Sequence, residues 1–260
     1  MDIIKYVILG IIQGLTEPLP ISSSGHLLIF RELFNTNMFN DLNFEVMVNF
    51  GSFIAILIIF WKDIVRLVTN FFKYLFADKK DKKKYYEDFK YCMLIVVGSI
   101  PVGIVGLLFK DQIEAFASVK EVGFALLITA LALFLVRSSK GKKKDNEITY
   151  KDAIIIGLFQ MCALLPGLSR SGMVLVGCLL CGLNRESSLK YTFMLYFPVS
   201  VASFGLSSID VIQSGIASNL LLGYFLGMVV AGIVTYFTYQ WLSKIVQNGK
   251  LWKFSIYCVV

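Results

Sequence analysis

The amino-acid sequence predicts an all-α integral membrane protein with about six transmembrane helices and two re-entrant helix–loop–helix segments. Of its 260 residues, 57% are hydrophobic and only 17% are charged, and the mean hydropathy is +0.71. Such a composition excludes an ordinary soluble domain. Several apolar runs approach the ~20 residues that a helix needs to cross a bilayer, and two of them are interrupted by proline and serine. We therefore expect one membrane domain over residues 1–260.

The apolar runs give the order of the expected helices. They cover residues 3–30, 44–61, 92–109, 121–137, 153–181, 190–209, 219–243 and 251–260. The run 251–260 is too short to span a membrane alone, and the chain ends within what should be the last span. The first run lacks the small-residue cleavage pattern of a secretory signal, so we expect it to belong to the mature fold.

Charge predicts how the chain is oriented. The basic residues behind the net charge of +7 are concentrated in the connections 79–90 and 140–151, which makes them topology signals rather than a nucleic-acid site. The spans 92–109 and 121–137 lie between these connections, so both connections can face the cytoplasm, and the connection 110–121 then faces outside. We expect a multi-pass protein of the plasma membrane with no nucleic-acid partner. Its five cysteines lie mostly in apolar runs and are expected to fill space in the core.

The first interrupted run contains the segment QGLTEPLPISSSGH at residues 13–26. A helix over residues 3–15 would rise only ~20 Å, short of the ~30 Å hydrocarbon core. Pro18 and Pro20 then remove two backbone donors and disfavour helical geometry at the residues before them. The helix should therefore stop in mid-membrane, and a second short helix should start behind the serines at 22–24, whose hydroxyls can cap it.

The same design recurs in the second half of the chain. Gly10, Gln13 and the segment Ser22–Gly25 each have a counterpart 147 residues later, the last in the segment SRSG at 169–172, next to Pro166. This predicts two repeats, of about 1–145 and 146–260. Three crossings separate the interrupted runs, so the repeats should have inverted topology. Broken helices survive in a bilayer only where protein or water covers their backbone, which predicts an internal polar cavity where the two loops meet.

Arg170 stands between Ser169 and Ser171 at an expected helix start. Its guanidinium, the two hydroxyls and the free backbone amides can converge on one anion, so we expect a phosphate site. An arginine in mid-membrane needs a partner, however. The alternative is that Arg170 forms an ion pair with Glu17 across the repeat interface.

Gln13 and Glu17 are four residues apart and should lie on one helix face. A carboxylate and an amide oxygen suit Mg²⁺ or Ca²⁺, either of which could bridge to phosphate oxygens. Glu17 could instead carry a proton or act as the counter-ion of Arg170. The single histidine, His26, could act as general acid, base or nucleophile, or could be an ordinary hydrogen-bonded interior residue.

The two loop motifs resemble the paired signatures of the undecaprenyl pyrophosphate phosphatase family of the bacitracin-resistance type. They are QGLTEPLPISSSGH at 13–26 and LPGLSRSG at 165–172. The segments 44–52 and 184–188 are also similar to this family, so the resemblance covers most of the chain. It implies removal of the terminal phosphate from a polyprenyl pyrophosphate, which regenerates the monophosphate carrier for cell-wall glycans.

The resemblance also implies roles for residues. It assigns Gln13 and Glu17 to the acidic motif, and Ser23 and His26 to the nucleophile and acid/base pair. It assigns residues 169–171 to the phosphate clamp. It further implies inverted repeats with re-entrant helix pairs and a site open to the outer face. Attack on phosphorus by Ser23, by His26 or by water activated through His26 all remain open.

The chain departs from the family at three positions. Val174 stands where the family commonly has threonine, Pro18 where it usually has an aromatic residue, and Asn49 where glutamine is frequent. A different class of function also fits inverted repeats with broken helices, namely a transporter that flips a polyprenyl phosphate. A passive channel fits less well, because Arg170 and Glu17 would trap an anion or pair with each other. Oligomeric state is open, including a homodimer.

Overall fold

A computed structural model describes residues 2–34, 42–109, 112–113, 118–214 and 220–260, and the fold over these ranges is all-α, as predicted. In chain order the helices are α1 (Asp2–Thr16), α2 (Ser23–Phe34), α3 (Leu42–Phe76), α4 (Lys82–Leu108), α6 (Val119–Leu135), the 3₁₀ helix η2 (Asp145–Glu147), α7 (Tyr150–Cys162), α8 (Arg170–Leu180), α9 (Arg185–Ser214), α10 (Leu221–Gln247) and α11 (Trp252–Val259). By length and composition, α3, α4 and α10 can each cross a membrane.

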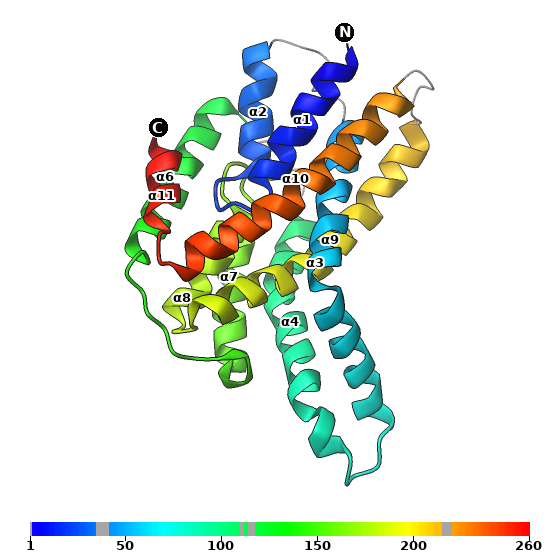
Figure 1. Ribbon diagram of the computed structural model, residues 1–260, viewed down its shortest axis with the longest axis vertical. Coiled ribbons are helices and arrows are strands. Elements are labelled where there is room, and N and C mark those ends of the chain that lie inside the picture. Colours follow the sequence, from blue (N-terminus) through cyan, green and yellow to red (C-terminus); the bar gives the residue numbers. More distant parts are fainter. Residues whose placement is uncertain (1, 35–41, 110–111, 114–117, 215–219) are drawn as a thin grey trace.

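Both interrupted runs form helical hairpins, which confirms the predicted helix breaks. In Figure 1, α1 descends and α2 returns toward the same end of the molecule, while α7 rises from the other end and α8 returns to it. The two tips meet in the middle. Ser171 Oγ of the second tip donates a hydrogen bond of 3.0 Å to the Leu19 carbonyl oxygen of the first.

The tip of the first hairpin is shaped by local hydrogen bonding. The last helical amide bond of α1 runs from Glu17 N to Gln13 O at 2.9 Å, and the two prolines that follow prevent the helix from continuing. Ser22 then adopts a positive φ of 68°, which is uncommon for a residue other than glycine. Its Oγ accepts a bond from Gly25 N at 3.2 Å, so Ser22 caps α2 as the serine cluster predicts.

The second tip depends on a glycine and a serine cap. Gly167 has a φ of +92°, and a Cβ atom at this position would lie 2.7 Å from the Cα of Val122. Ser169 caps α8 by accepting a 3.1 Å bond from Gly172 N. The tip is therefore seated directly on α6, and the SRS segment enters α8 in a defined orientation.

Each hairpin packs on a helix of the other half of the chain. Helix α1 lies against α10, where a side chain on Gly10 would collide with the backbone of Gly227. Helix α7 lies against α4, where a side chain on Gly157 would collide with the backbone of Gly98. Gly10 and Gly157 are counterparts in the predicted repeat. This reciprocal packing supports the division into halves, and the inverted relation between them stays a prediction.

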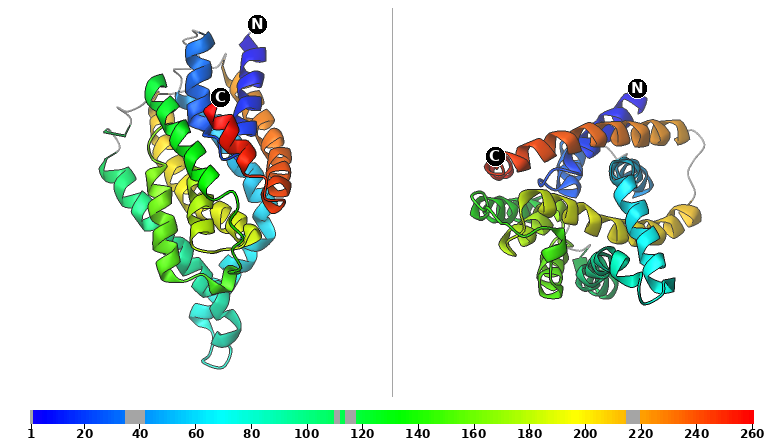
Figure 2. Two further views of the ribbon diagram at one scale, coloured as in Figure 1. Left: turned by 90° about the vertical axis from the view of Figure 1, so that its left-hand side faces the viewer. Right: turned by 60° about the horizontal axis from the view of Figure 1, so that its bottom comes forward.

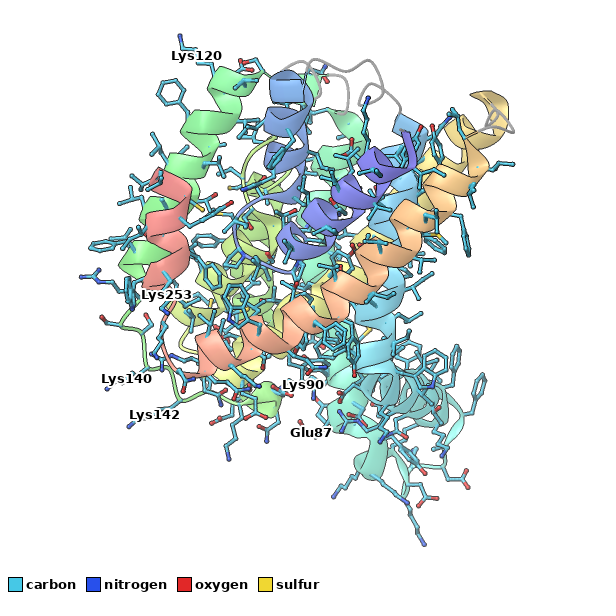
Figure 3. The ribbon with its side chains drawn as sticks, turned by 45° about the horizontal axis from the view of Figure 1, so that its top comes forward. Glu87, Lys90, Lys120, Lys140, Lys142 and Lys253 are labelled. Atoms are coloured by element: carbon cyan, nitrogen blue, oxygen red, sulfur yellow. The ribbon has the colours of Figure 1, made fainter. Side chains whose placement is uncertain are left out.

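The two basic connections lie at one end of the molecule, opposite the connection 110–121. Figure 3 shows Lys140 and Lys142 at the same end as Lys90, with Lys120 at the opposite end. The predicted topology requires this, because the connections 79–90 and 140–151 should face one side and the connection 110–121 the other. Part of the latter, residues 110–111 and 114–117, lies outside the described residues.

Helices α3 and α4 continue past the body of the protein as a projecting hairpin (Figures 1 and 2). At its base, Arg66 of α3 lies 3.7 Å from Asp88 of α4. Lys190 of α9 bridges Asp63 at 3.2 Å and Asp145 at 3.0 Å. These ion pairs join α3, α4, η2 and α9 at the lysine-rich end.

Candidate active site

A cavity of about 230 Å³ lies between the two hairpin tips, where the sequence predicts a polar cavity. It is walled by both tips together with α3 and α9. Among the residues that line it are Gln13, Glu17, Ser22, Ser23, Ser24, Glu45, Asn49, Gln160, Ser169, Arg170, Ser171, Val174 and Tyr196. The structure thus brings six of the seven candidate site residues around one space.

The Glu17 carboxylate and the Ser23 hydroxyl form the closest polar pair in this cavity. Ser23 Oγ donates a hydrogen bond of 2.5 Å to Glu17 Oε2. The same oxygen accepts from Gln13 Nε2 at 3.0 Å, which confirms that Gln13 and Glu17 share a helix face. Gln13 Nε2 also donates to Asn49 Oδ1 at 2.6 Å. A serine whose proton points at a carboxylate has the arrangement of a nucleophile beside its base.

Arg170 reaches the cavity from the first turn of α8. Its Nη1 donates a long bond of 3.4 Å to Ser200 Oγ, and its Cζ lies 5.5 Å from the ring centroid of Tyr196. Within the described ranges it forms no ion pair with Glu17, contrary to the alternative raised by the sequence. Most of its donors therefore stay available for an anion.

The serines on either side of Arg170 hold the second tip in shape. Ser169, which is 1% exposed, uses its Oγ to cap α8 and lies 3.3 Å from Ser171 Oγ. Ser171 also bonds the carbonyl of the first tip. Both hydroxyls line the cavity beside the free amides of the α8 N-terminus, which is a favourable place for phosphate oxygens.

His26 is the one candidate residue that does not line the cavity. Its Nδ1 lies 2.7 Å from the Ser22 carbonyl oxygen, and its Nε2 lies 2.8 Å from the Tyr257 hydroxyl of α11. A carbonyl only accepts, so Nδ1 carries the proton and Nε2 of the neutral ring accepts from Tyr257. Both ring nitrogens therefore have hydrogen-bond partners outside the cavity. The role of His26 as acid, base or nucleophile stays a prediction.

Sequence reasoning missed several polar residues of the wall. Glu45 and Asn49 come from α3, and Gln160 and Tyr196 come from α7 and α9. The available signal was spacing: Glu45 and Asn49 are four residues apart, as Gln13 and Glu17 are, and stand at the start of an apolar span. The Tyr196 ring lies 5.5 Å from Arg170 Cζ, and no local pattern could have indicated that contact.

The residues near Glu17 suit a hard divalent cation. Gln13 is fully buried, yet its Oε1 has no hydrogen-bond partner, and Gln160 Oε1 is in the same state. The orphaned oxygen of Gln13, whose amide nitrogen bonds the Glu17 carboxylate, is an acceptor that a Mg²⁺ or Ca²⁺ ion can satisfy. Among the described residues no group of three His, Cys, Asp or Glu could hold a metal alone. An ion here would therefore need water or substrate oxygens as further ligands.

Comparison with known proteins gives a consistent picture. The sequence profile of the family described as bacitracin resistance protein BacA matches residues 6–260. The chain is 41% identical over 259 residues to undecaprenyl-diphosphatase 2 of Bacillus thuringiensis, with 99% of this chain and 94% of that protein covered. It is 42% identical over 261 residues to the undecaprenyl-diphosphatase of Oceanobacillus iheyensis, with the same coverage. It is also 42% identical over 260 residues to undecaprenyl-diphosphatase 1 of Bacillus licheniformis, with 99% and 95% covered.

Proposed function

The chain belongs to the bacitracin resistance protein BacA family, and from this we propose that it hydrolyses undecaprenyl pyrophosphate to the monophosphate and inorganic phosphate. One structural observation carries the proposal: the Ser23 hydroxyl is hydrogen-bonded to the Glu17 carboxylate in a cavity that also receives Arg170. A nucleophile, a base and an anion clamp are the parts that phosphoryl transfer needs.

Substrate binding depends on the second tip. The Arg170 guanidinium, the Ser171 hydroxyl and the first amides of α8 hold the terminal phosphate, with Ser169 fixing the turn. The polyprenyl tail stays among the apolar helices. Val174 forms part of the cavity wall and offers no hydroxyl, so the phosphate is held without the contact that threonine would add.

The geometry supports Ser23 as the nucleophile. As Ser23 Oγ attacks the terminal phosphorus, its proton passes to Glu17, and the bond from phosphorus to the bridging oxygen breaks. Undecaprenyl monophosphate leaves as an anion, and a phosphoserine remains at Ser23. Glu17 gives up its proton to the departing monophosphate and is again a carboxylate. It then deprotonates a water that attacks the phosphoserine, the bond from phosphorus to Ser23 Oγ breaks, and the proton held by Glu17 returns to Ser23 as inorganic phosphate leaves. Arg170 stabilises the charge on the transferring group in both steps.

A divalent ion held by Glu17 and Gln13, with Glu45 and Asn49 nearby, is part of the proposal. Bound there, Mg²⁺ or Ca²⁺ would neutralise charge on the phosphate oxygens. The chain's own share is to orient the carboxylate: Gln13 and Ser23 both donate to one oxygen of Glu17 and fix its position.

We further propose that the protein lies in the plasma membrane with its cavity open to the extracytoplasmic side. The gathering of lysines at the end from which the α7–α8 hairpin enters supports this orientation, because basic connections face the cytoplasm. In this orientation the α1–α2 hairpin, with its serine and carboxylate, enters from outside.

Phosphate release from undecaprenyl pyrophosphate by the purified chain in proteoliposomes tests the proposal. Arg170→Ala should lower kcat/KM by about a hundred- to a thousandfold, since a charged donor to the transition state is lost. Arg137→Ala is the matched control, because Arg137 is exposed and its guanidinium, within the described part of the chain, contacts the carbonyl and ring of Phe134, away from the cavity. Near-normal phosphate release by a folded Arg170→Ala protein would contradict the proposal that Arg170 holds the terminal phosphate.

The same vesicles separate the alternatives. A chelator should suppress release, and Mg²⁺ or Ca²⁺ should restore it; release that is indifferent to the chelator would refute the metal. Transfer of polyprenyl phosphate between leaflets without any phosphate release would instead identify a transporter. The Ser23–Glu17 pair favours hydrolysis, because a carrier needs no nucleophile.

A further inference from the structure

The projecting end of the α3–α4 hairpin, residues 67–90, is the largest feature that the proposed hydrolysis does not use. Helix α3 has 35 residues, which corresponds to a length of ~52 Å, whereas the hydrocarbon core is only ~30 Å thick. Figure 2 shows this end extending beyond every other element. We call residues 67–90 the α3–α4 extension.

The two helices of the extension are packed against each other by specific side-chain contacts. Phe89 stacks on Tyr74 with ring centroids 4.1 Å apart and on Phe71 at 5.3 Å. Asn70 Nδ2 donates a 2.6 Å bond to Asp88 Oδ2. These contacts join the two helices along their inner faces, so the outer faces keep a fixed orientation.

One outer face of the extension is apolar and exposed. Phe76 is 85% exposed and Phe72 is 53% exposed. With their neighbours they form a stripe along α3 at helical spacing, which consists of Trp61, Val65, Val68, Phe72, Leu75 and Phe76. The stripe begins on the part of α3 that crosses the membrane, so the surface that meets lipid tails continues without interruption onto the extension.

The turn of the extension is strongly basic. Between residues 73 and 84 there are six lysines against two aspartates. Lys82 lies 5.2 Å from the ring centroid of Tyr74, and Lys73 and Lys84 both lie over Tyr85, at 5.7 and 5.6 Å. Lysine heads placed around aromatic rings at the edge of an apolar face are the arrangement of a segment that rests in a charged membrane interface.

We propose that the α3–α4 extension docks on anionic phospholipid headgroups, with its apolar stripe against the acyl boundary and its lysines on the phosphates. The positive charge of the lysines favours anionic lipid over a second copy of the chain. A second copy of the chain would bring another six lysines to the same place and would be repelled. Anionic lipid complements the lysines and also covers the stripe, because the stripe is continuous with the lipid-facing part of α3.

The test uses the full chain in vesicles of phosphatidylcholine and phosphatidylglycerol in fixed ratio. Phe76→Trp places a fluorophore at the tip, and the signal of the parent chain, with its three tryptophans, is subtracted. Bromine is carried either by the phosphatidylglycerol or by an equal fraction of the phosphatidylcholine. Brominated phosphatidylglycerol should quench the tip at least about twofold more, because basic residues enrich anionic lipid around them.

A triple variant tests the lysines. Replacing Lys79, Lys80 and Lys83, none of which lies over a ring, by glutamine in the Phe76→Trp chain should make the two brominated lipids equivalent. The matched control, Lys140, Lys142 and Lys144 to glutamine in the other basic connection, should keep the difference. Phosphate release recorded on the same vesicles reports folding.

Two results would overturn the proposal. Equal quenching by both lipids in the unmodified extension would mean contact without headgroup recognition. No quenching by either would mean that water or a protein covers the stripe. Neither result bears on the hydrolysis proposed above, which rests on other residues.

Discussion

At the residue scale, the decisive contact joins positions six residues apart across the broken helix. The spacing of Gln13 and Glu17 predicted their shared face, and the structure confirms it. The meeting of Ser23 with Glu17 could not be predicted from periodicity, because it depends on the path of the loop between them. That path follows from two prolines and from the positive φ of Ser22.

The Ser23–Glu17 pair makes a sharp prediction. Ser23→Ala and Glu17→Gln should each reduce phosphate release by about a hundred- to ten-thousandfold, since one removes the proposed nucleophile and the other its proposed base. The measurement is single-turnover release from undecaprenyl pyrophosphate. Ser24→Ala is the control, because Ser24 lines the same cavity but its hydroxyl bonds only Ser22.

The pattern of results separates the mechanisms. If Ser23→Ala were fully active and Glu17→Gln inactive, the nucleophile would be water rather than Ser23. A third outcome, in which both variants keep near-normal rates, would contradict any role for the pair. His26 shows the limit of sequence reasoning at this scale. Its position beside the serines predicts a catalytic group, which stays a prediction, but its contact with Tyr257, 231 residues away, could not be predicted from the sequence.

At the element scale, the sequence predicted both broken helices and their serine caps. Proline and serine act over a few residues, so their effects are legible locally. The lengths of the elements were harder to predict: α3 and α4 extend well past the apolar runs 44–61 and 92–109 at the ends that face each other. Ion pairs and aromatic contacts outside the hydrocarbon region stabilise those extensions, and hydropathy does not register them.

Gly167 gives a prediction about the second tip. Gly167→Ala forces a side chain into a left-handed backbone conformation and against Val122, at a cost of about 1–3 kcal/mol. We expect a Tm lower by roughly 2–10 °C in detergent and slower phosphate release, because Ser169 and Arg170 follow directly.

The control for this substitution is Gly103→Ala. Gly103 lies within α4 and nothing approaches its Cβ position within 4 Å. Alanine is the better helix former, so its Tm should equal or exceed that of the parent. If Gly167→Ala were equally harmless, the tip would not depend on this glycine.

At the scale of the whole molecule, composition and charge predicted an all-α membrane protein, and the structure and the relatives confirm that class. The constant offset between the motifs predicted two halves. What the sequence could not supply is the way they engage. Gly10 approaches the backbone of Gly227, and Gly157 that of Gly98, because these glycines have no side chain in the way. A glycine in the sequence does not indicate which distant residue it will approach.

The orientation is testable with single cysteines. Lys120→Cys should react with a membrane-impermeant maleimide on intact cells, whereas Lys80→Cys and Lys142→Cys should react only after permeabilisation, because lysine-rich connections stay inside. The parent chain, with its five cysteines, provides the background. Labelling of Lys142→Cys on intact cells would invert the proposed topology and move the mouth of the cavity to the cytoplasm.

Each hairpin packs on a helix of the other half of the chain, and this makes the two halves depend on each other. In the proposed site neither half is complete, because Glu17 and Ser23 come from the first hairpin and Arg170 comes from the second. If the chain were cut in the connection between α6 and η2, the two fragments would have to associate before the broken helix of either one was shielded from lipid. Such mutual dependence is what a fusion of the two subunits of a dimer into one chain would produce.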